Sequence, residues 1–211
     1  METDTIHLLV SFDKNYIGPF QVLLKSLAIT NPKESFHIWL LHSSIPHEDL
    51  YALEGFCAAH HTTLTPVAVD RTIFKNAPVS KQYPQEMYYR LLAPLVLPST
   101  LERILYLDPD ILSINPVRPL WELSLGDRAF AAASHSGVFE IINGVNRMRL
   151  KKEHDYYNTG VLLMDLAKAR GLVKAEEVFR CVREEPEKLL LPDQDVFNLL
   201  YGCLLYTSRC V

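Results

Sequence analysis

The stretch Arg103–Asp110 reads Arg-Ile-Leu-Tyr-Leu-Asp-Pro-Asp and carries the clearest information about the fold. Its segment Ile104–Leu107 is a short apolar run, which is typical of a buried β-strand. Two carboxylates, Asp108 and Asp110, follow this run directly and flank a proline. In open α/β sheets, ligands bind beyond the carboxyl ends of the strands. We therefore interpret this stretch as a strand that ends at a binding site.

Upstream of this strand, predicted strands and helices alternate. Pro66 places the third strand at an edge of the sheet, because proline cannot donate a hydrogen bond to a neighbouring strand. The alternation predicts an α/β fold with a mainly parallel sheet that helices flank on both faces. The predicted elements are strand Ile6–Phe12, a helix from Gly18 to Thr30 with apolar residues Phe20, Leu23, Leu24 and Leu27, strand Phe36–Leu41, a helix marked by Leu50, Leu53 and Cys57, strand Thr63–Val69 and helix Pro84–Leu95.

Downstream of Asp110 the alternation loosens. The sequence predicts strands Ala129–Ser134 and Tyr156–Leu163, a helix over Leu166–Arg183 and a last helix, Asp193–Leu200, that Pro192 starts. Without repeats or an obvious linker, residues 1–202 are expected to form one domain. The tail, residues 203–211, matches no periodic element, which suggests that the chain is cut short there. The segment between the last two strands, His135–His154, contains a basic cluster made of Arg147, Arg149, Lys151 and Lys152.

Composition excludes several classes of protein. The 211 residues are 48% hydrophobic, which excludes disorder, and the net charge of −4 provides no basic field for a nucleic-acid partner. The four cysteines have no paired spacing, which favours a reduced protein over a disulfide framework. No apolar run approaches the roughly 20 residues of a membrane helix, and the N-terminus does not resemble a signal peptide. We expect a soluble, cytoplasmic protein.

The pair Asp108 and Asp110 has two interpretations. Two carboxylates placed two residues apart can supply hard oxygen ligands to Mg²⁺ or Mn²⁺, and such an ion would neutralise a diphosphate. Alternatively, Asp and Pro are ordinary turn residues that simply end the strand. The residues alone leave both open.

Two further polar stretches are candidate site segments. Asp193-Gln194-Asp195 could bind a sugar, although acidic residues also suit the positive end of a helix dipole. Asn158, Thr159 and Gly160 precede a buried strand, where the asparagine amide could bind a hydroxyl-rich ligand or the glycine could form a bulge. Motifs for dinucleotide binding, P-loops, zinc proteases and serine hydrolases are missing.

Read in order, five stretches of the chain resemble the retaining glycosyltransferases of family 8, the group of glycogenin and the lipopolysaccharide galactosyltransferases. Five ordered matches are much more specific than one short motif, and they extend over roughly residues 5–202. The stretches are Leu8–Tyr16, Met87–Leu91, Ile104–Asp110, Tyr157–Val161 and Asp193–Asn198.

The resemblance implies a Rossmann-like GT-A fold and hexose transfer from a UDP-sugar, UDP-glucose or UDP-galactose, to a glycan or glycolipid acceptor. It implies a metal site, Mn²⁺ or Mg²⁺, at Asp108 and Asp110. The other implied roles are uridine contacts from Asp13 and Asn15, nucleotide contacts from Arg90 and Asp108, sugar contacts from Arg90, Asn158, Gly160, Asp193 and Gln194, and the catalytic roles of Asp193 and Gln194 beside the reacting carbon.

Two departures from the family pattern affect these expectations. The family usually places an acidic residue after the small-residue strand, where this chain has His135. The C-terminal H-x-x-G-x-x-K segment of the family, which supplies a metal-ligating histidine and a diphosphate-binding lysine, is also absent. The alternatives are therefore a domain that binds UDP-sugar without turnover and a Mg²⁺-dependent nucleotidyltransferase. Retention itself leaves two routes open, a double displacement and a same-face attack.

Overall fold

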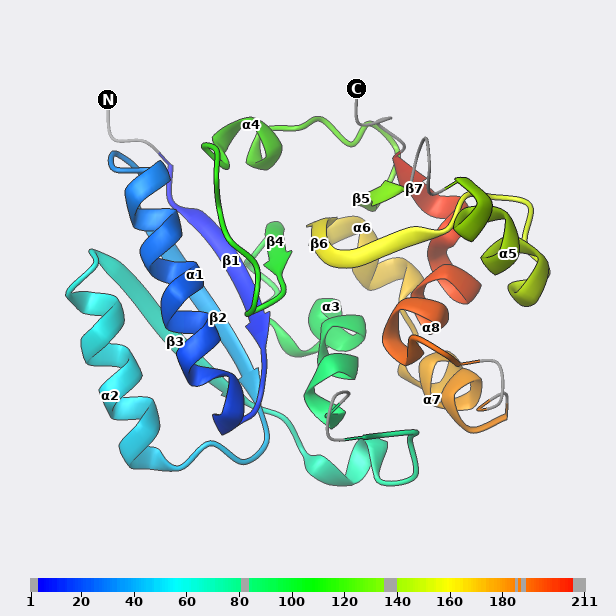
Figure 1. The fold of residues 1–211 in the computed structure, drawn as a ribbon, viewed down its shortest axis with the longest axis horizontal. Coiled ribbons are helices and arrows are strands. Elements are labelled where there is room, and N and C mark those ends of the chain that lie inside the picture. The colour runs from blue at the N-terminus through cyan, green and yellow to red at the C-terminus, as the bar shows by residue number, and fades with distance from the viewer. Residues whose placement is uncertain (1–3, 81–83, 135–139, 185, 187–188, 207–211) are drawn as a thin grey trace.

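The computed structural model describes residues 4–80, 84–134, 140–184, 186 and 189–206. Within these residues the strands form one seven-stranded sheet in the order β3-β2-β1-β4-β6-β5-β7 (Figure 1). The strands are β1 Ile6–Ser11, β2 Phe36–His42, β3 Thr62–Ala68, β4 Arg103–Leu107, β5 Phe130–Ser134, β6 Tyr157–Asp165 and β7 Leu205–Tyr206. The α-helices are α1 Ile17–Thr30, α2 His47–Ala58, α3 Ala93–Val96, α4 Arg118–Trp121, α5 Glu140–Leu150, α6 Leu166–Leu172, α7 Ala175–Glu184 and α8 Pro192–Tyr201.

The N-terminal half follows the sequence-based expectation closely. Strands β3, β2, β1 and β4 run parallel, with Leu8 of β1 opposite Ile38 of β2 and Leu105 of β4. Strand β3 is at the edge of the sheet, as Pro66 predicts, so the missing donor of the proline falls where it is tolerated. The prediction of an α/β fold with a mixed, mainly parallel sheet is confirmed.

Strand β6 sets the geometry of the rest of the molecule. It runs antiparallel to both of its neighbours, β4 and β5. Its N-terminal end therefore lies beside the carboxyl end of β4, with Val161 opposite Leu107. The amide of Asp108 donates to the carbonyl oxygen of Gly160 at 2.8 Å, which extends this pairing into the acidic turn.

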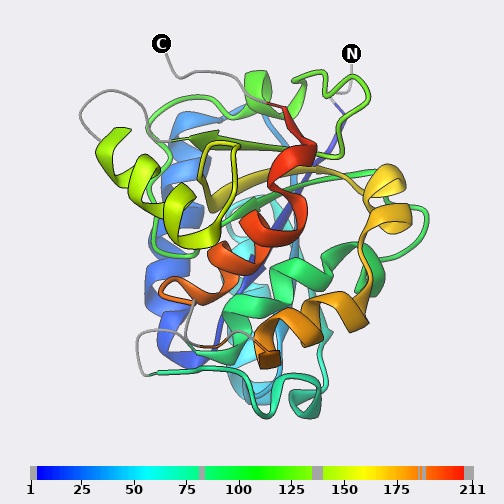
Figure 2. The same cartoon turned by 90° about the vertical axis from the view of Figure 1, so that its right-hand side faces the viewer.

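Alternating residues of each strand pack on opposite faces of the sheet. Leu8 and Val10 of β1 belong to one apolar cluster, together with Phe20 and Leu24 of α1, whereas Leu9 belongs to a second cluster. The second cluster contains residues of α6, α7 and α8. Figure 2 shows α7 and α8 in front of the sheet and α1 behind it. Burying each such side chain stabilises the fold by about 1.5–3 kcal/mol.

Two predictions about elements are wrong in part. The helix expected over Pro84–Leu95 is mostly a 3₁₀-helix, η3 Gln85–Leu92, followed by the short α3. The helix expected over Leu166–Arg183 is two helices, because Val173 adopts an extended conformation between them and is buried. The segment that precedes β6 contains the helix α5, which the sequence pattern did not indicate.

The structure also describes the first part of the tail. Residues 203–206 join the fold, since Gly202–Leu204 forms a 3₁₀-helix, η6, and β7 pairs with β5. A two-residue strand has no periodicity from which it could be predicted. Residues 207–211 and His135 lie outside the described residues. In the described part of the chain, none of the helices has the length and apolar character needed to span a bilayer.

Candidate active site

A cavity of about 240 Å³ lies at the carboxyl ends of β1 and β4. Asp108 and Asp110 line it together with residues from distant segments of the chain. The cavity therefore lies where the sequence predicts a binding site, beyond the carboxyl end of β4. Its lining includes one guanidinium and three carboxylates, those of Arg90, Asp108, Asp110 and Asp193. The remaining lining residues are Ser11, Phe12, Tyr16, Pro84, Met87, Pro109, Thr159, Leu191 and Gln194.

Arg90 is at the centre of the site and is only 7% exposed. Its Nη2 lies 2.8 Å from Oδ1 of Asp108, and its Nε lies 3.2 Å from Oδ2 of Asp193. The Nε and Nη1 atoms also donate to the carbonyl oxygens of Met87 and Thr159, each at 3.0 Å. Burial alone would lower the pKa of this guanidinium, but the two carboxylates outweigh that effect and raise it. Arg90 is therefore a fixed positive charge that joins η3, β4, β6 and α8.

Tyr106 contacts both Arg90 and Asp108 and was not among the site residues expected from the sequence. The guanidinium carbon of Arg90 lies 4.2 Å from the centre of its ring, within cation–π distance. Its hydroxyl donates to Oδ1 of Asp108 at 2.8 Å. Burial raises the pKa of Tyr106 well above its usual value, so this group remains a donor. The sequence signal that could have identified Tyr106 is its hydroxyl, the one polar side-chain group in the apolar run Ile104–Leu107.

Gly160 is required by the close approach of β6 to the acidic turn. A Cβ atom on Gly160 would lie 2.5 Å from Oδ2 of Asp108, a distance that side chains do not adopt. Its amide donates to Oδ1 of Asn158 at 2.8 Å. Neither Asn158 nor Gly160 lines the cavity, whereas Thr159 between them does. The predicted sugar contacts from Asn158 and Gly160 therefore stay predictions, and Thr159 is an additional site residue.

Asp193 and Gln194 begin α8 and face the cavity, each 8% exposed. The hydroxyl of Thr159 donates to Oδ2 of Asp193 at 3.3 Å, and the amide of Thr159 donates to Oε1 of Gln194 at 3.2 Å. Burial raises the pKa of Asp193, Arg90 opposes this rise and Asp108 adds to it. Both residues that the sequence analysis placed beside the reacting carbon thus lie at one wall of the cavity.

Asp13 and Asn15 form a local turn beside the cavity. The backbone and side-chain amides of Asn15 donate to the two oxygens of Asp13, at 2.8 and 2.9 Å. Their neighbours Phe12 and Tyr16 line the cavity, but Asp13 and Asn15 themselves do not. The structure therefore brings the segment to the site, while the contacts of Asp13 and Asn15 with a base remain a prediction.

Asp108 and Asp110 provide oxygen donors of the kind that Mn²⁺ and Mg²⁺ prefer. Oδ1 of Asp108 is engaged by Arg90 and Tyr106, and Asp110 is exposed at the cavity. Among the described residues no group of three or more His, Cys, Asp and Glu side chains gathers in a metal-binding arrangement. The donor chemistry fits a divalent ion, and these residues supply part of a coordination shell.

Asp195 and Asn198 complete the polar first half of α8, but they point away from the cavity. Both are fully buried. The Asn198 side chain accepts from the amide of Tyr157 and donates to its carbonyl oxygen, at 2.8 Å each, so it acts as an additional strand partner for β6. From the sequence, Asp195 was a candidate sugar contact as part of Asp193-Gln194-Asp195, and Asn198 had no expected role.

Comparison with known proteins gives the same picture from the sequence side. General stress protein A of Bacillus subtilis is 24% identical over 201 residues, which cover 93% of this chain and 69% of that protein. Lipopolysaccharide 1,2-glucosyltransferase of Escherichia coli is 24% identical over 202 residues, which cover 95% of this chain but only 60% of the relative. The chain thus spans roughly two thirds of the length of these relatives.

Among solved structures, the galactosyltransferase LgtC in complex with donor and acceptor sugar analogues has a similar fold. The TM-score is 0.82 and the sequence identity 21%, over 95% of this chain and 72% of that one. At this identity the similarity concerns the fold, which is the GT-A fold expected from the sequence. The sequence pattern of glycosyl transferase family 8 matches residues 7–206. This chain belongs to glycosyl transferase family 8.

Proposed function

We propose that the protein is a retaining hexosyltransferase that transfers glucose or galactose from its UDP derivative to a glycan or glycolipid acceptor. The observation that carries the proposal is the cavity itself. It gathers Arg90, Asp108, Asp110, Asp193 and Gln194 from three distant segments of the chain at the carboxyl edge of the sheet. The family and its lipopolysaccharide glucosyl- and galactosyltransferase members support the class of reaction.

A divalent cation, Mn²⁺ or Mg²⁺, belongs to this proposal for an electrostatic reason. The cavity contains three carboxylates and one guanidinium, so its formal charge is negative and would repel a diphosphate. Asp108 and Asp110 are the residues that would hold the ion. When bound, it stabilises the negative charge that develops on the departing UDP.

The remaining roles in the proposed reaction belong to residues of the chain. Asp13 and Asn15 hold the uridine, and Arg90 orients the sugar and the diphosphate. Asp193 stabilises the positive charge of an oxocarbenium-like transition state, because its carboxylate is buried, paired with Arg90 and accepts from Thr159. Gln194 faces the reacting carbon, and Asn158 and Gly160, which do not line the cavity, hold the segment that carries Thr159 beside the sugar.

The acceptor is a glycan or glycolipid, and the donor is cytosolic in this proposal. Lipopolysaccharide glycosyltransferases of Escherichia coli and Salmonella typhimurium among the relatives support a glycolipid acceptor. The LgtC complex with donor and acceptor sugar analogues supports a site shared by two sugars. The protein would then act in the cytoplasm, with at most a peripheral contact with the membrane.

Calorimetric titration of UDP into the protein tests the site. In the presence of Mn²⁺ the wild type should bind UDP, whereas EDTA or Asp110→Ala should weaken binding at least ~10-fold, about 1.4 kcal/mol. A matched control is Asp127→Ala, which removes an exposed carboxylate in the loop before β5. Equal UDP binding in all four samples would disprove the metal role.

Product analysis tests the reaction. UDP-glucose and UDP-galactose should each be incubated with Mn²⁺, and proton NMR should follow UDP release and the anomeric configuration of the product. Retention of configuration with release of UDP supports the proposal. UDP binding without turnover would instead favour the binding-domain alternative, and release of pyrophosphate from a nucleoside triphosphate would favour the nucleotidyltransferase.

A further inference from the structure

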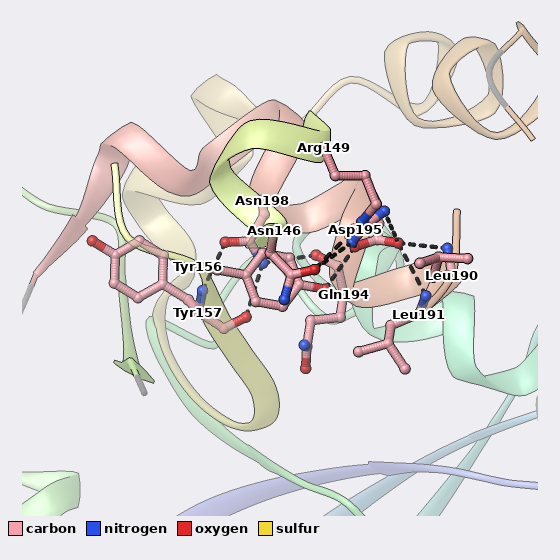
Figure 3. A network of polar contacts seen from close by, with 9 residues as sticks. All are labelled: Asn146, Arg149, Tyr156, Tyr157, Leu190, Leu191, Gln194, Asp195 and Asn198. Carbon is pink, nitrogen blue, oxygen red and sulfur yellow. Dashed lines mark hydrogen bonds and ion pairs between the residues drawn. The ribbon is translucent and has the colours of Figure 1, made fainter. Parts of the chain in front are cut away.

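The first turn of α8 carries three consecutive polar residues that serve two sides of the helix. Asp193 and Gln194 line the cavity, whereas Asp195 does not and is 0% exposed. In Figure 3 the Gln194 side chain points away from the Asp195 carboxylate. The buried Asp195 carboxylate therefore does not face the substrate of the proposed reaction, and its role must lie in its contacts with the protein.

Asp195 accepts five hydrogen bonds (Figure 3). Its Oδ1 accepts from Nη2 of Arg149 and from the hydroxyl of Tyr156, both at 2.6 Å. Its Oδ2 accepts from Nη1 of Arg149 at 3.0 Å and from the amides of Leu190 and Leu191 at 2.7 and 3.0 Å. A carboxylate offers about four lone-pair positions, so this group is saturated. It is suited to hold structure rather than to attack a sugar.

The donors come from three separate segments of the chain. Arg149 lies on α5, Tyr156 immediately precedes β6, and the two amides belong to the turn that leads into α8. Leu191 also lines the cavity, and its carbonyl oxygen accepts from the Asp195 amide at 2.7 Å. The Asp195 carboxylate therefore connects the N-terminus of α8 to α5 and to the start of β6.

The described side chains of α5 make polar contacts, and Leu150 is the one buried apolar residue among them. The α5 side chains Ile141, Val145 and Met148 are 78%, 51% and 74% exposed, whereas Asn143 is 5% exposed. Asn143 donates to Asp155 and accepts from the amide of Tyr156. Since much of its apolar surface faces solvent, hydrophobic burial contributes less to its placement than in α1. The bidentate pair with Asp195 is thus a principal link between α5 and α8.

We propose that Arg149 and Asp195 are positioning residues that fix the rotation of α8 and so orient Asp193 and Gln194 toward the cavity. Asp193, Gln194 and Asp195 share one helical turn, so a rotation that breaks the Asp195 contacts also moves the two cavity-facing groups. Thr159 holds those groups on the opposite side of the turn. As a statement about catalysis, this inference rests on the proposed transferase function.

The test compares two arginine variants, Arg149→Met and Arg118→Met. Arg118 forms a similar bidentate pair with Glu34, where the side chains are 19% and 14% exposed, against 18% and 0% for Arg149 and Asp195. Arg118 lies outside the cavity, so it controls for the loss of a partly buried ion pair. Donor turnover, KM for UDP-sugar, melting temperature and amide exchange of Thr159 are measured in each.

Both variants should melt at a lower temperature, but only Arg149→Met should lower kcat, by about 10- to 100-fold, with KM for the donor within about threefold. The Thr159 amide, which donates to Gln194, should exchange about tenfold faster in Arg149→Met alone. Tyr156→Phe removes the hydroxyl that donates to Asp195 and also interacts with Gln194, without changing the shape of the ring. It serves as a milder variant with the same signs if Arg149→Met does not fold.

Two results would overturn the positioning role: an unchanged kcat in Arg149→Met and Tyr156→Phe, or equal Thr159 exchange in Arg149→Met and Arg118→Met. A wild type without any donor turnover would overturn the proposed function instead. In that case the exchange of Thr159, which needs no activity, still decides whether the pair positions α8.

Discussion

In the N-terminal half of the sheet, β1 and β2 are covered on both faces by apolar side chains, whereas the C-terminal half is organised around α8 by buried polar groups. Leu8, Leu24 and Leu53 are each at most 1% exposed in the first region. In the second region Asp195 and Asn198 are equally buried, and each has several hydrogen-bond partners. The two regions therefore reach the same degree of burial by different chemistry.

The difference indicates which contacts fix the positions of individual groups in this molecule. Apolar contacts are non-directional, so they tolerate small shifts and mainly determine how stable the fold is. Hydrogen bonds and ion pairs depend steeply on distance and angle, so they determine where a group points. The cavity lies where the two regions meet, and its reactive groups are held by the directional contacts. Substitutions should thus separate stability from activity between the two regions.

The largest effect is expected for Arg90→Met, which leaves the carboxylates of Asp108 and Asp193 without their cation. Removing one partner of a buried pair destabilises by about 3–5 kcal/mol, and donor turnover should fall by about 10³-fold. Steady-state kinetics of UDP release and thermal unfolding measure the two effects. Arg90→Lys should recover part of the stability but little turnover, because lysine lacks the planar fork. Turnover within tenfold of wild type in Arg90→Met would contradict the central role of this residue.

Leu24→Ala probes the apolar region. Leu24 is 0% exposed, so the truncation should lower the free energy of unfolding by about 2–5 kcal/mol. The kcat for donor turnover should remain within about twofold of wild type at temperatures where the variant is folded. The control is Val22→Ala on the same helix, where the side chain is 56% exposed and the change should be about 0.5 kcal/mol or less. A loss of kcat in folded Leu24→Ala would contradict the view that the apolar region affects stability and not activity.

Asn198→Ala tests the polar region without touching the cavity. The change removes the partners of the Tyr157 amide and carbonyl and of the Gln194 carbonyl. Unsatisfied buried groups should lower the free energy of unfolding by about 1–3 kcal/mol. Because these groups join β6 to α8, kcat should also fall a few-fold, unlike in Leu24→Ala. Chemical denaturation and kinetics measure both, with the exposed Asn115→Ala as control.

The smallest effect concerns pH and returns to the N-terminal region. Burial lowers the pKa of His7 and His37, which pair across β1 and β2, and the charge of His37 lowers the pKa of His7 further. The unfolded chain, with histidine pKa values of about 6.5, therefore binds more protons below that pH. The free energy of unfolding should be greatest above about pH 6.5 and fall as the pH decreases toward the lowered values.

Chemical denaturation between pH 5 and 8 measures this dependence. His37→Asn should make it shallower, since one of the two half-buried imidazoles is gone and the other loses a repulsive neighbour. Each pH unit of difference between folded and unfolded pKa values corresponds to at most about 1.4 kcal/mol. A steeper slope in His37→Asn would refute the explanation.

The sequence allowed most elements of the N-terminal half to be predicted, because their apolar spacing matches the period of the element that they form. The prediction fails where that relation breaks. In η3 every residue from Glu86 to Leu92 is buried, so no polar face remains to indicate a helical period. In α5 several apolar residues face solvent, so the usual relation between pattern and burial is inverted. Of these two segments, η3 lines the cavity through Met87 and Arg90, and α5 contacts the helix α8 that lines it.

By itself the sequence determined the α/β class and the position of the acidic turn at the end of a strand, and it offered Asp193 and Gln194 as site candidates, whereas Arg90 was a candidate only through the resemblance to family 8. Those features depend on short-range periodicity and on residue chemistry. Only the tertiary structure decided that β6 runs antiparallel beside β4, that Tyr106 and Thr159 join the site and that Asp195 faces Arg149. Apart from the Tyr106 hydroxyl, which donates to Asp108 two residues further on, these contacts join residues that are tens of positions apart, and their partners are chosen by directional hydrogen bonds that leave no regular spacing in the chain.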